Sequence, residues 1–459
     1  MTDETDVLII GAGAAGLAAA RELSAAKYNV IVLEARDRIG GRIHTHPDSQ
    51  LTAPIELGAE FVHGKAPETL RLAERAGVKL IKLPNTHWYL RNTILSQSRE
   101  FWSAIEAVDE AMAKYKGDDK SFAEFLDEYS RAHEVDDVRA IATLYVEGFH
   151  AAHADRISVL GLIKTNEAAA AIHEEKQFRP AGGYLPLMHW LYSEAVAHGA
   201  SFRLETVVRE IAWSAGAVTV TADAGEQFKA RRLIVTLPLG VLQRNEVTFT
   251  PRLIAKEEAA NKLAMGEVVK IVLRFRERFW EQISLPSQSG QRVSLKELAF
   301  LHSPDELPAT WWTQLPVRAP LLVGWAGGTR AEQLLQNETS SLQHAASPHG
   351  NADALLDKSL AALSHMFAEP MKSIEDQLVD FYLHDWSTDP FSFGAYSYIP
   401  VGGLKAQAAL AETIENTIYF AGEATNEKGH HGTVNGALAS ALHAVQLIQQ
   451  TSHLRFPLV

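Results

Sequence analysis

The sequence predicts an α/β protein, and three observations near its start lead to that prediction. An apolar run, Val7–Ile10, is long enough for a buried parallel strand. Glycines follow at the spacing G-x-G-x-x-G, and the residues from Ala14 to Ala26 are rich in strong helix formers. A second apolar run, Val30–Leu33, leads directly into Glu34. Together these features are typical of a Rossmann-like dinucleotide-binding unit.

Each residue of this unit has a physical role in holding a dinucleotide. Gly11 allows the tight turn, Gly13 lets the backbone approach a pyrophosphate, and Gly16 lets the helix pack closely on the strand. The phosphates would lie at the helix N-terminus, near Ala15, where free N–H groups and the helix dipole favour anions. Glu34 stands near the distance along the chain that is expected for an acceptor of the ribose hydroxyl groups.

The segment after Glu34 points to a cofactor longer than NAD. Ala35 and Arg36 begin a turn that contains Gly40-Gly41-Arg42, a double glycine with arginines on both sides. Such a turn suits a second approach to phosphate or ribose. An NAD enzyme has no general need for it, whereas FAD bound in an extended form does. A strand and another glycine-permitted close approach follow at Ile55–Gly64.

Composition and charge narrow the class of protein. The 459 residues suggest two or three domains, and 46% hydrophobic with 22% charged residues is an ordinary globular composition that argues against wholesale disorder. The net charge of −13 argues against a nucleic-acid partner, because phosphate binding needs a basic face, and it is compatible with a cationic substrate. The chain has no cysteine, which excludes disulfides, thiolate metal sites and a cysteine nucleophile. No metal site is expected.

The N-terminus and the hydropathy pattern predict a cytoplasmic location. Met1–Asp6 is acidic and lacks the basic and apolar regions of a signal peptide. No run of about 18 uncharged apolar residues occurs, so no membrane span is expected. The oligomeric state stays open at this point.

With its later motifs included, the chain resembles the flavin-containing amine oxidase family of monoamine oxidases, polyamine oxidases and lysine-specific histone demethylases. The resemblance rests on the dinucleotide fingerprint, on Gly40-Gly41-Arg42 and on Leu57-Gly58-Ala59-Glu60-Phe61. Two C-terminal blocks, His384–Tyr398 and Ile418–Ala441, strengthen it, so it spans nearly the whole chain. Its motifs are most similar to those of polyamine oxidases.

The resemblance implies a non-covalently bound FAD. Some members link the flavin to a cysteine at the position where this chain has Ala395. The backbone at Val208 would meet the adenine, and Glu423 would contact the ribitol or a linking water. The residues expected to bind the cofactor are Gly11, Gly13, Ala15, Gly16, Glu34, Ala35, Arg36, Gly41, Arg42, Gly58, Ala59, Glu60, Val208, Trp386, Gly422, Glu423, Thr433, Val434 and Ala437.

The resemblance also assigns residues to the reactive face of the flavin. Lys270 lies on the polar face of an alternating strand, Val268–Phe275, and would hold a water against flavin N5. Without the resemblance it would be an ordinary solvated lysine, and the two aromatic residues below would be ordinary core residues. The expected catalytic residues are Lys270, Tyr396 as an aromatic wall, Trp386 packed against the flavin, and Thr433, where monoamine oxidases have a second tyrosine. The residues expected to bind the substrate are Glu60, His63, Tyr396 and His430.

The expected architecture has two discontinuous domains. Residues 1–83, 202–270 and 400–459 would form a Rossmann-like FAD-binding domain. Residues 84–201 and 271–399 would form an α+β substrate-binding domain with a helical segment and a mixed sheet. The pattern from about 84 to 200 is helical, and Ser121-Phe-Ala-Glu has the spacing of a capping box at a helix start.

The reaction that the resemblance implies is the oxidation of a small-molecule amine, with a polyamine favoured. Hydride transfer to flavin N5 would give an imine, water would hydrolyse the imine to a carbonyl compound, and O2 would reoxidise the flavin to give hydrogen peroxide. An L-amino-acid oxidase, or another FAD oxidoreductase on the same scaffold, is an alternative. A flavin-binding interaction protein without turnover is an alternative from another class. The particular amine, the C–N bond that is oxidised and the physiological electron acceptor stay open.

Overall fold

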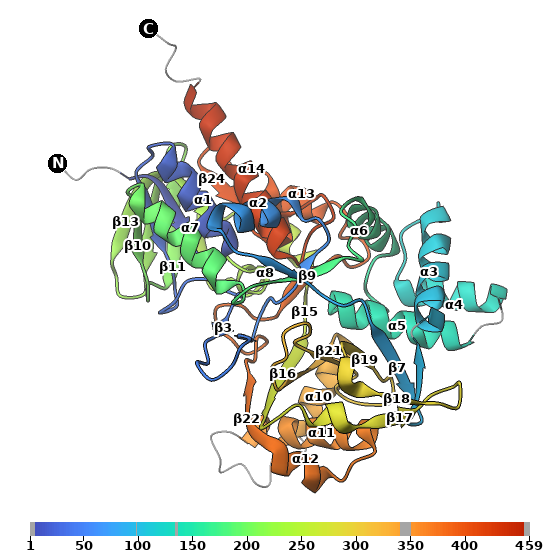
Figure 1. Cartoon of the computed structure of the whole chain (residues 1–459). Helices are drawn as coiled ribbons and strands as arrows, with labels where there is room; N and C mark the ends of the chain where they lie inside the picture. Colours follow the sequence, from blue (N-terminus) through green and yellow to red (C-terminus); the bar gives the residue numbers. More distant parts are fainter. Residues whose placement is uncertain (1–4, 98, 134–135, 340–349, 454–459) are drawn as a thin grey trace.

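The computed structural model describes residues 5–97, 99–133, 136–339 and 350–453. Figure 1 shows two lobes, one built from blue, green and red segments of the chain and the other mainly from yellow and orange segments. Helices and strands are mixed through the chain, and the predicted α/β class is confirmed. Among the described helices, none combines the length and the apolar character that crossing a bilayer requires.

The first lobe is built on a sheet that collects strands from distant parts of the chain. Among the described residues its order is β10-β2-β1-β13-β12-β11-β14, and β24 also pairs with β13. Strands β2, β1, β13 and β24 are parallel, so their carboxyl ends lie at one edge, where such sheets bind ligands. The strands are β1 (Thr5–Ile10), β2 (Val30–Leu33), β10 (Ser201–Arg203), β11 (Val208–Ser214), β12 (Ala217–Ala222), β13 (Gln227–Val235), β14 (Thr248–Thr250) and β24 (Ile418–Phe420).

Helix α1 (Ala14–Ala25) follows β1 directly, which confirms the predicted strand, turn and helix. It packs against α7 (Leu185–Ala197) and α14 (Val434–His453), and α2 (Pro67–Ala76) joins the same layer. Residues 18–20 of α1 are three buried alanines, whose small side chains let the neighbouring helices approach closely.

The second lobe contains another sheet, in the order β22-β16-β21-β20-β19-β7-β8 among the described residues. Strand β16 pairs on both sides and is buried on both faces, as an interior strand should be. Helices α10 (Thr329–Thr339), α11 (Gly350–Phe367) and α12 (Met371–Gln377) belong to this lobe. The strands are β7 (His87–Arg91), β8 (Ile94–Gln97), β16 (Val268–Phe275), β19 (Phe300–His302), β20 (Thr310–Thr313), β21 (Leu321–Gly327) and β22 (Leu378–Leu383).

Four helices share one apolar core, and one of them, α5, packs on β21 of the second sheet: α3 (Arg99–Lys114), α4 (Phe122–His133), α5 (Asp136–His150) and α6 (Val159–Ala171). The capping box before α4 is confirmed, because the Ser121 N–H donates to Glu124 and the Glu124 N–H donates back to the Ser121 hydroxyl oxygen. The helical prediction was wrong at the start of this segment, where β7 and β8 form a hairpin. The aromatic sequence of β7 pairs with β19 at the sheet edge, and this long-range pairing decides its structure.

Short strands and helices connect the two lobes. Strand β9 (Gln177–Pro180) pairs with both β5 (Val62–His63) and β6 (Leu80–Lys82). Strand β15 (Ala264–Gly266) pairs with β23 (Tyr396–Tyr398), which brings Tyr396 beside the entry to β16. The remaining elements are β3 (Thr45–His46), β4 (Ile55–Glu56), β17 (Ser284–Pro286), β18 (Arg292–Ser294), α8 (Leu239–Gln243), α9 (Ile254–Asn261) and α13 (Ala406–Ala411).

The domain boundaries stay a prediction. Two elements, α7 and β16, pack in a different lobe from the one that those boundaries assign to all or part of them. Helix α7 lies within residues 84–201, yet it packs on α1 and contributes Leu187 and Leu191 to the core of the first lobe. Strand β16 runs across the predicted boundary at residue 270 and belongs wholly to the second sheet. Lys270 is therefore carried by the second lobe.

Candidate active site

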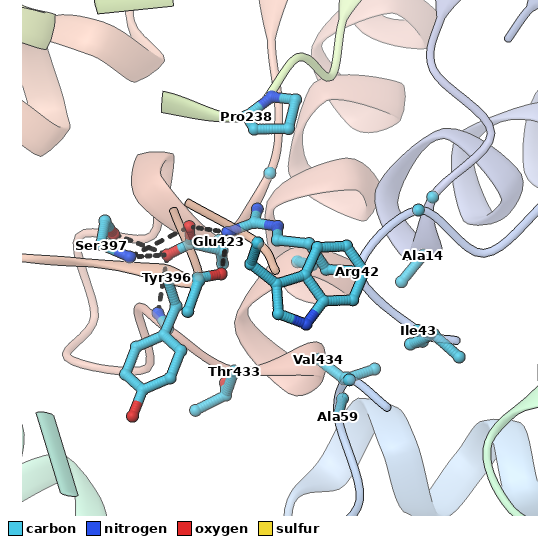
Figure 2. Close-up of a pocket in the computed structure, with 18 of the residues that line it drawn as sticks. Ala14, Arg42, Ile43, Ala59, Pro238, Tyr396, Ser397, Glu423, Thr433 and Val434 are labelled. Carbon is cyan, nitrogen blue, oxygen red and sulfur yellow. Dashed lines mark hydrogen bonds and ion pairs between the residues drawn. The ribbon is translucent and has the colours of Figure 1, made fainter. Parts of the chain in front are cut away.

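A cavity lies where the carboxyl ends of the first sheet meet the second lobe, and Figure 2 shows part of its lining. Nearly every residue that the sequence assigned to a cofactor, substrate or catalytic role lines this cavity. Gly16 is the exception, and its position explains why. A Cβ atom at Gly16 would lie 1.9 Å from the carbonyl oxygen of Gly11, so this glycine serves the close packing of helix on turn.

The glycine turn is shaped for an anion. Gly11 has φ +100°, which a glycine adopts without strain. Helix α1 begins after Gly13, whose lack of a side chain leaves the N–H groups of the first turn, Ala14 and Ala15, without a side-chain cap. Unsatisfied N–H groups at a helix N-terminus are suited to a pyrophosphate.

Glu34 lies beside this turn and is almost fully buried. One carboxylate oxygen accepts from the Ala12 N–H at 2.6 Å, and the other accepts from the Arg36 N–H at 2.9 Å. Burial raises the pKa of Glu34, although both backbone donors oppose that shift. Glu34 therefore fixes the turn. It also lines the cavity, so its position is compatible with the predicted contact with a ribose, which stays a prediction.

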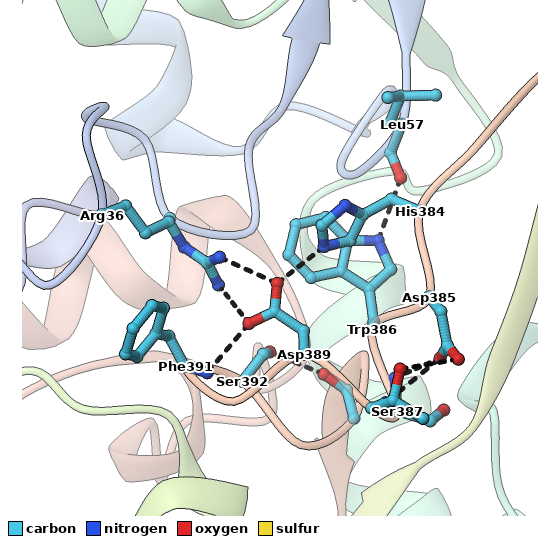
Figure 3. A network of polar contacts seen from close by, with 12 residues as sticks. Arg36, Leu57, His384, Asp385, Trp386, Ser387, Asp389, Phe391 and Ser392 are labelled. Atoms are coloured by element: carbon cyan, nitrogen blue, oxygen red, sulfur yellow. Dashed lines mark hydrogen bonds and ion pairs between the residues drawn. The ribbon is translucent and has the colours of Figure 1, made fainter. Parts of the chain in front are cut away.

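The side chain of Arg36 faces a protein partner. Its guanidinium donates to both oxygens of Asp389 at 2.8 Å, and His384 lies 2.7 Å from the same carboxylate (Figure 3). Burial would raise the pKa of Asp389, but His384 and Arg36 outweigh it and hold that pKa well below its usual range. The network anchors the loop that carries Trp386, whose indole N–H donates to the Leu57 carbonyl oxygen at 3.0 Å.

A second polar junction ties the C-terminal motif to the double-glycine turn (Figure 2). Arg42 donates to the Ala395 carbonyl oxygen and to Glu423, both at 2.9 Å. Glu423 also accepts from the Ser397 hydroxyl at 2.6 Å and from the Gly432 N–H at 2.8 Å. Its carboxylate is thus largely satisfied by the protein, and its expected contact with the ribitol stays a prediction.

Thr433 caps the helix that borders the site. Its hydroxyl oxygen accepts from the Gly436 N–H at 2.9 Å, which caps the N-terminus of α14, and the hydroxyl donates to the His430 carbonyl oxygen at 2.7 Å. The first turn of α14, with Val434 and Ala437, lines the cavity. The positive end of a helix dipole is therefore directed at the space where a flavin ring would lie.

Lys270 is buried, which argues against the alternative of an ordinary solvated lysine, and the strand face predicted to be polar is buried like the other face. Its ammonium donates to Glu60 at 2.7 Å and to the Gly58 carbonyl oxygen at 3.1 Å. The other oxygen of Glu60 accepts from Arg179 at 2.7 Å, with Trp312 and Gln314 completing the set of donors at 3.1 and 3.3 Å. Burial alone would raise the pKa of Glu60, but Lys270 and Arg179 outweigh it and lower that pKa to about 2.

The donors around Glu60 already occupy its carboxylate, which limits the contact with substrate that was predicted for this residue. A substrate ammonium could approach its carboxylate only by displacing donors from Lys270 or Arg179. Sequence reasoning missed Arg179 and Trp312, because nothing in a linear motif indicates that β9, β16 and β20 place these side chains around Glu60. What the sequence did contain was an acidic residue within a strand-and-glycine motif, a position that calls for a cationic partner when buried.

The second-lobe end of the cavity is aromatic. The Tyr396 hydroxyl donates to the Phe149 carbonyl oxygen at 2.8 Å. The ring of Phe149 stacks on Tyr145 with centroids 5.5 Å apart and meets His63 edge-on at the same distance. Phe149 and Tyr145 escaped sequence analysis because on α5 they are ordinary members of an amphipathic helix.

One continuous cavity joins a cradle suited to a dinucleotide in one lobe to an aromatic chamber in the other, an arrangement suited to a redox enzyme. The family model for flavin-containing amine oxidoreductases matches residues 14–449. The chain therefore belongs to this family, an oxidoreductase family, and the predicted resemblance is confirmed.

Individual relatives agree with this assignment. Polyamine oxidase 4 of Oryza sativa subsp. japonica is 29% identical over 95% of this chain and 87% of its own length. Lysine-specific histone demethylase 2 of Homo sapiens is 28% identical over 96% of this chain and 53% of its own length. Among solved structures, putrescine oxidase bound to putrescine has a TM-score of 0.77 at 21% identity, with 97% of this chain and 99% of that chain covered. Cyclohexylamine oxidase from Brevibacterium oxydans IH-35A has a TM-score of 0.76 at 21% identity, with 98% and 100% covered.

Proposed function

We propose that this protein is an FAD-dependent oxidase of amines with a preference for polyamines. One observation carries the choice of an amine over an amino acid. Among the described residues, each arginine and lysine that lines the cavity already has a carboxylate partner: Arg36 pairs with Asp389, Arg42 with Glu423, Arg209 with Glu246 and Lys270 with Glu60. An L-amino-acid oxidase needs a cation for the substrate carboxylate, and this chamber does not offer a free one.

The residues present fit FAD. The uncapped N-terminus of α1 suits the pyrophosphate, and Gly422 has no atom within 4 Å of the Cβ it lacks, which leaves open space beside the cavity. When bound, FAD would supply the acceptor for the hydride of the amine and the site at which O2 is reduced. With Ala395 at the linking position and no cysteine in the chain, we propose that FAD is held non-covalently.

The chain's own residues would bind and orient the amine. Tyr396 and Phe149 offer aromatic surface, which packs on methylene groups and attracts cations. Burial lowers the pKa of His63 to about 4, and burial likewise lowers the pKa of His431 to about 4. Both histidines are therefore neutral near pH 7 and do not repel an ammonium. Lys270, fixed by Glu60, supplies a positive charge beside the reacting groups, where little water competes.

The experiment is anaerobic mixing of the FAD-loaded protein with spermine, spermidine, putrescine, benzylamine and an L-amino acid, followed by flavin absorbance. We expect the polyamines to bleach the flavin fastest and air to restore the absorbance with release of hydrogen peroxide. Bleaching by benzylamine alone would refute the polyamine preference. Bleaching by the amino acid alone would favour the amino-acid oxidase, and no bleaching by any compound would favour the interaction protein.

A further inference from the structure

Glu174 stands in the turn between α6 and β9, and Figure 1 shows β9 at the junction of the two lobes. Antiparallel pairing of β5 with β9 holds this turn against the strand that carries His63. The Gly64 N–H donates to the Lys176 carbonyl oxygen at 2.7 Å, and Gly64 has φ +63°. A Cβ atom there would lie 3.0 Å from the Glu174 Cα, so the missing side chain of Gly64 lets the two backbone segments lie close together.

The carboxylate of Glu174 lines the cavity and has no cationic partner of its own. Within the described residues, no arginine or lysine forms an ion pair with it. The side chain of His63 can carry a positive charge when it is protonated, and its Nδ1 lies 3.9 Å from a Glu174 oxygen, beyond hydrogen-bond distance. Nδ1 of His63 is itself buried without a hydrogen-bond partner, and this imidazole is neutral near pH 7.

A series of contacts through His63 and Phe149 links Glu174 to Tyr396. The ring of Phe149 contacts His63 on one side, and its backbone carbonyl oxygen accepts from Tyr396. Tyr145 stacks on the same ring, and burial, with the charge of Glu174 as a further cause, raises the pKa of Tyr145. An apolar aromatic passage thus separates the predicted wall residue Tyr396 from a carboxylate without a counterion.

We propose that Glu174 binds a second, distal ammonium group of the substrate. The proposal rests on the function proposed above and restricts the substrate class to amines with a second ammonium group. A diamine or polyamine would place one nitrogen beside Tyr396, run its methylene groups along Phe149 and Tyr145, and pair its next nitrogen with Glu174. The Glu174 side chain is only 25% exposed, so water screens its attraction to a partner of opposite charge less than it would at the protein surface. A monoamine would leave Glu174 unpaired.

The protonation of Glu174 gives this proposal a pH signature. Burial raises the pKa of Glu174 to about 7. The titratable groups that face it from the packed elements are His63 on β5 and Tyr145 on α5. The pKa of His63 lies at about 4 and that of Tyr145 is raised, so neither changes charge near pH 7. The carboxylate is charged above about pH 7 and becomes neutral below it, and affinity for a distal ammonium should fall in the same direction.

The variant Glu174→Gln keeps the size of the side chain and removes its charge. The matched control is Glu175→Gln, because Glu175 is the next residue in the same turn and its side chain is 60% exposed. Binding is measured by calorimetry on FAD-loaded protein that has been reduced and kept anaerobic, so that no turnover occurs. Putrescine and spermidine are the test ligands, and butylamine is the monoamine of matched length.

We expect Glu174→Gln to weaken putrescine and spermidine binding by about tenfold or more and to change butylamine binding less than twofold. Glu175→Gln should behave as the wild type. The wild-type affinity for putrescine should fall from pH 8 to pH 6, and this dependence should be absent in Glu174→Gln. Equal losses for putrescine and butylamine, or no loss for either, would overturn the proposal. Selective loss of putrescine binding in a protein that oxidises no amine would support this subsite and refute the proposed function instead.

Discussion

The charge of Glu60 is expected to stabilise the fold as well as position Lys270. Its carboxylate is buried between Lys270 and Arg179, and its pKa of about 2 lies well below the ordinary value of 4.5. A pKa lowered this far corresponds to a contribution on the order of 3 kcal/mol to the folding free energy. Because the folded-state pKa is depressed, this stability is present above about pH 4.5 and is lost as the pH falls toward 2.

The substitution Glu60→Gln should therefore cost about 3 kcal/mol at pH 7, since it leaves two buried cations facing each other without a counterion. The measurement is urea unfolding followed by tryptophan fluorescence at saturating FAD. Glu210→Gln, an exposed carboxylate on β11, is the control and should change stability by less than about 0.5 kcal/mol. In the double variant Glu60→Gln/Lys270→Met, the cost should be smaller than the sum of the two single costs by at least about 1 kcal/mol. Strict additivity, or a Glu60→Gln protein as stable as the control, would refute the buried charge cluster.

Three further outcomes are expected. Lys270→Met should retain FAD but slow turnover by about 10²-fold or more, because it removes a preorganised charge; stopped-flow rates of both half-reactions equal to the wild type would contradict this role. Acid or heat denaturation should release all flavin into the supernatant, as the chain has no cysteine, and flavin in the pellet would show a covalent bond through another residue. Glu34→Ala should raise the dissociation constant for FAD by about tenfold or more, the effect of losing a charge-assisted hydrogen bond of about 1.5–3 kcal/mol, and unchanged fluorescence titrations would assign Glu34 to the turn alone.

The parts that could be predicted from sequence are those in which neighbouring residues decide the structure. The run from Val7 to Glu34 specifies a strand, a turn, a helix and a strand within one short segment, and the structure forms all of them. The family followed from several such blocks. The environment of Lys270 could not be predicted in this way, because its partner Glu60 lies 210 residues away and Arg179 lies on a third element. Glu174 is likewise an unremarkable turn residue until β5 and β9 pair.

The order of assembly of the first sheet has a consequence for synthesis of the protein. Strand β13 pairs with β1, which is synthesised before it, and with β24, which is synthesised after it, and α1 packs on α14, which follows α1 by more than 400 residues. At about 5–20 residues per second, the ribosome needs roughly 20–80 s to pass from the glycine turn to Thr433. The nascent N-terminal unit must remain uncovered for that time, and the cradle cannot receive its cofactor before α14 emerges. Truncation of the chain ahead of Thr433 should therefore abolish cofactor loading even though every residue of the dinucleotide fingerprint is present.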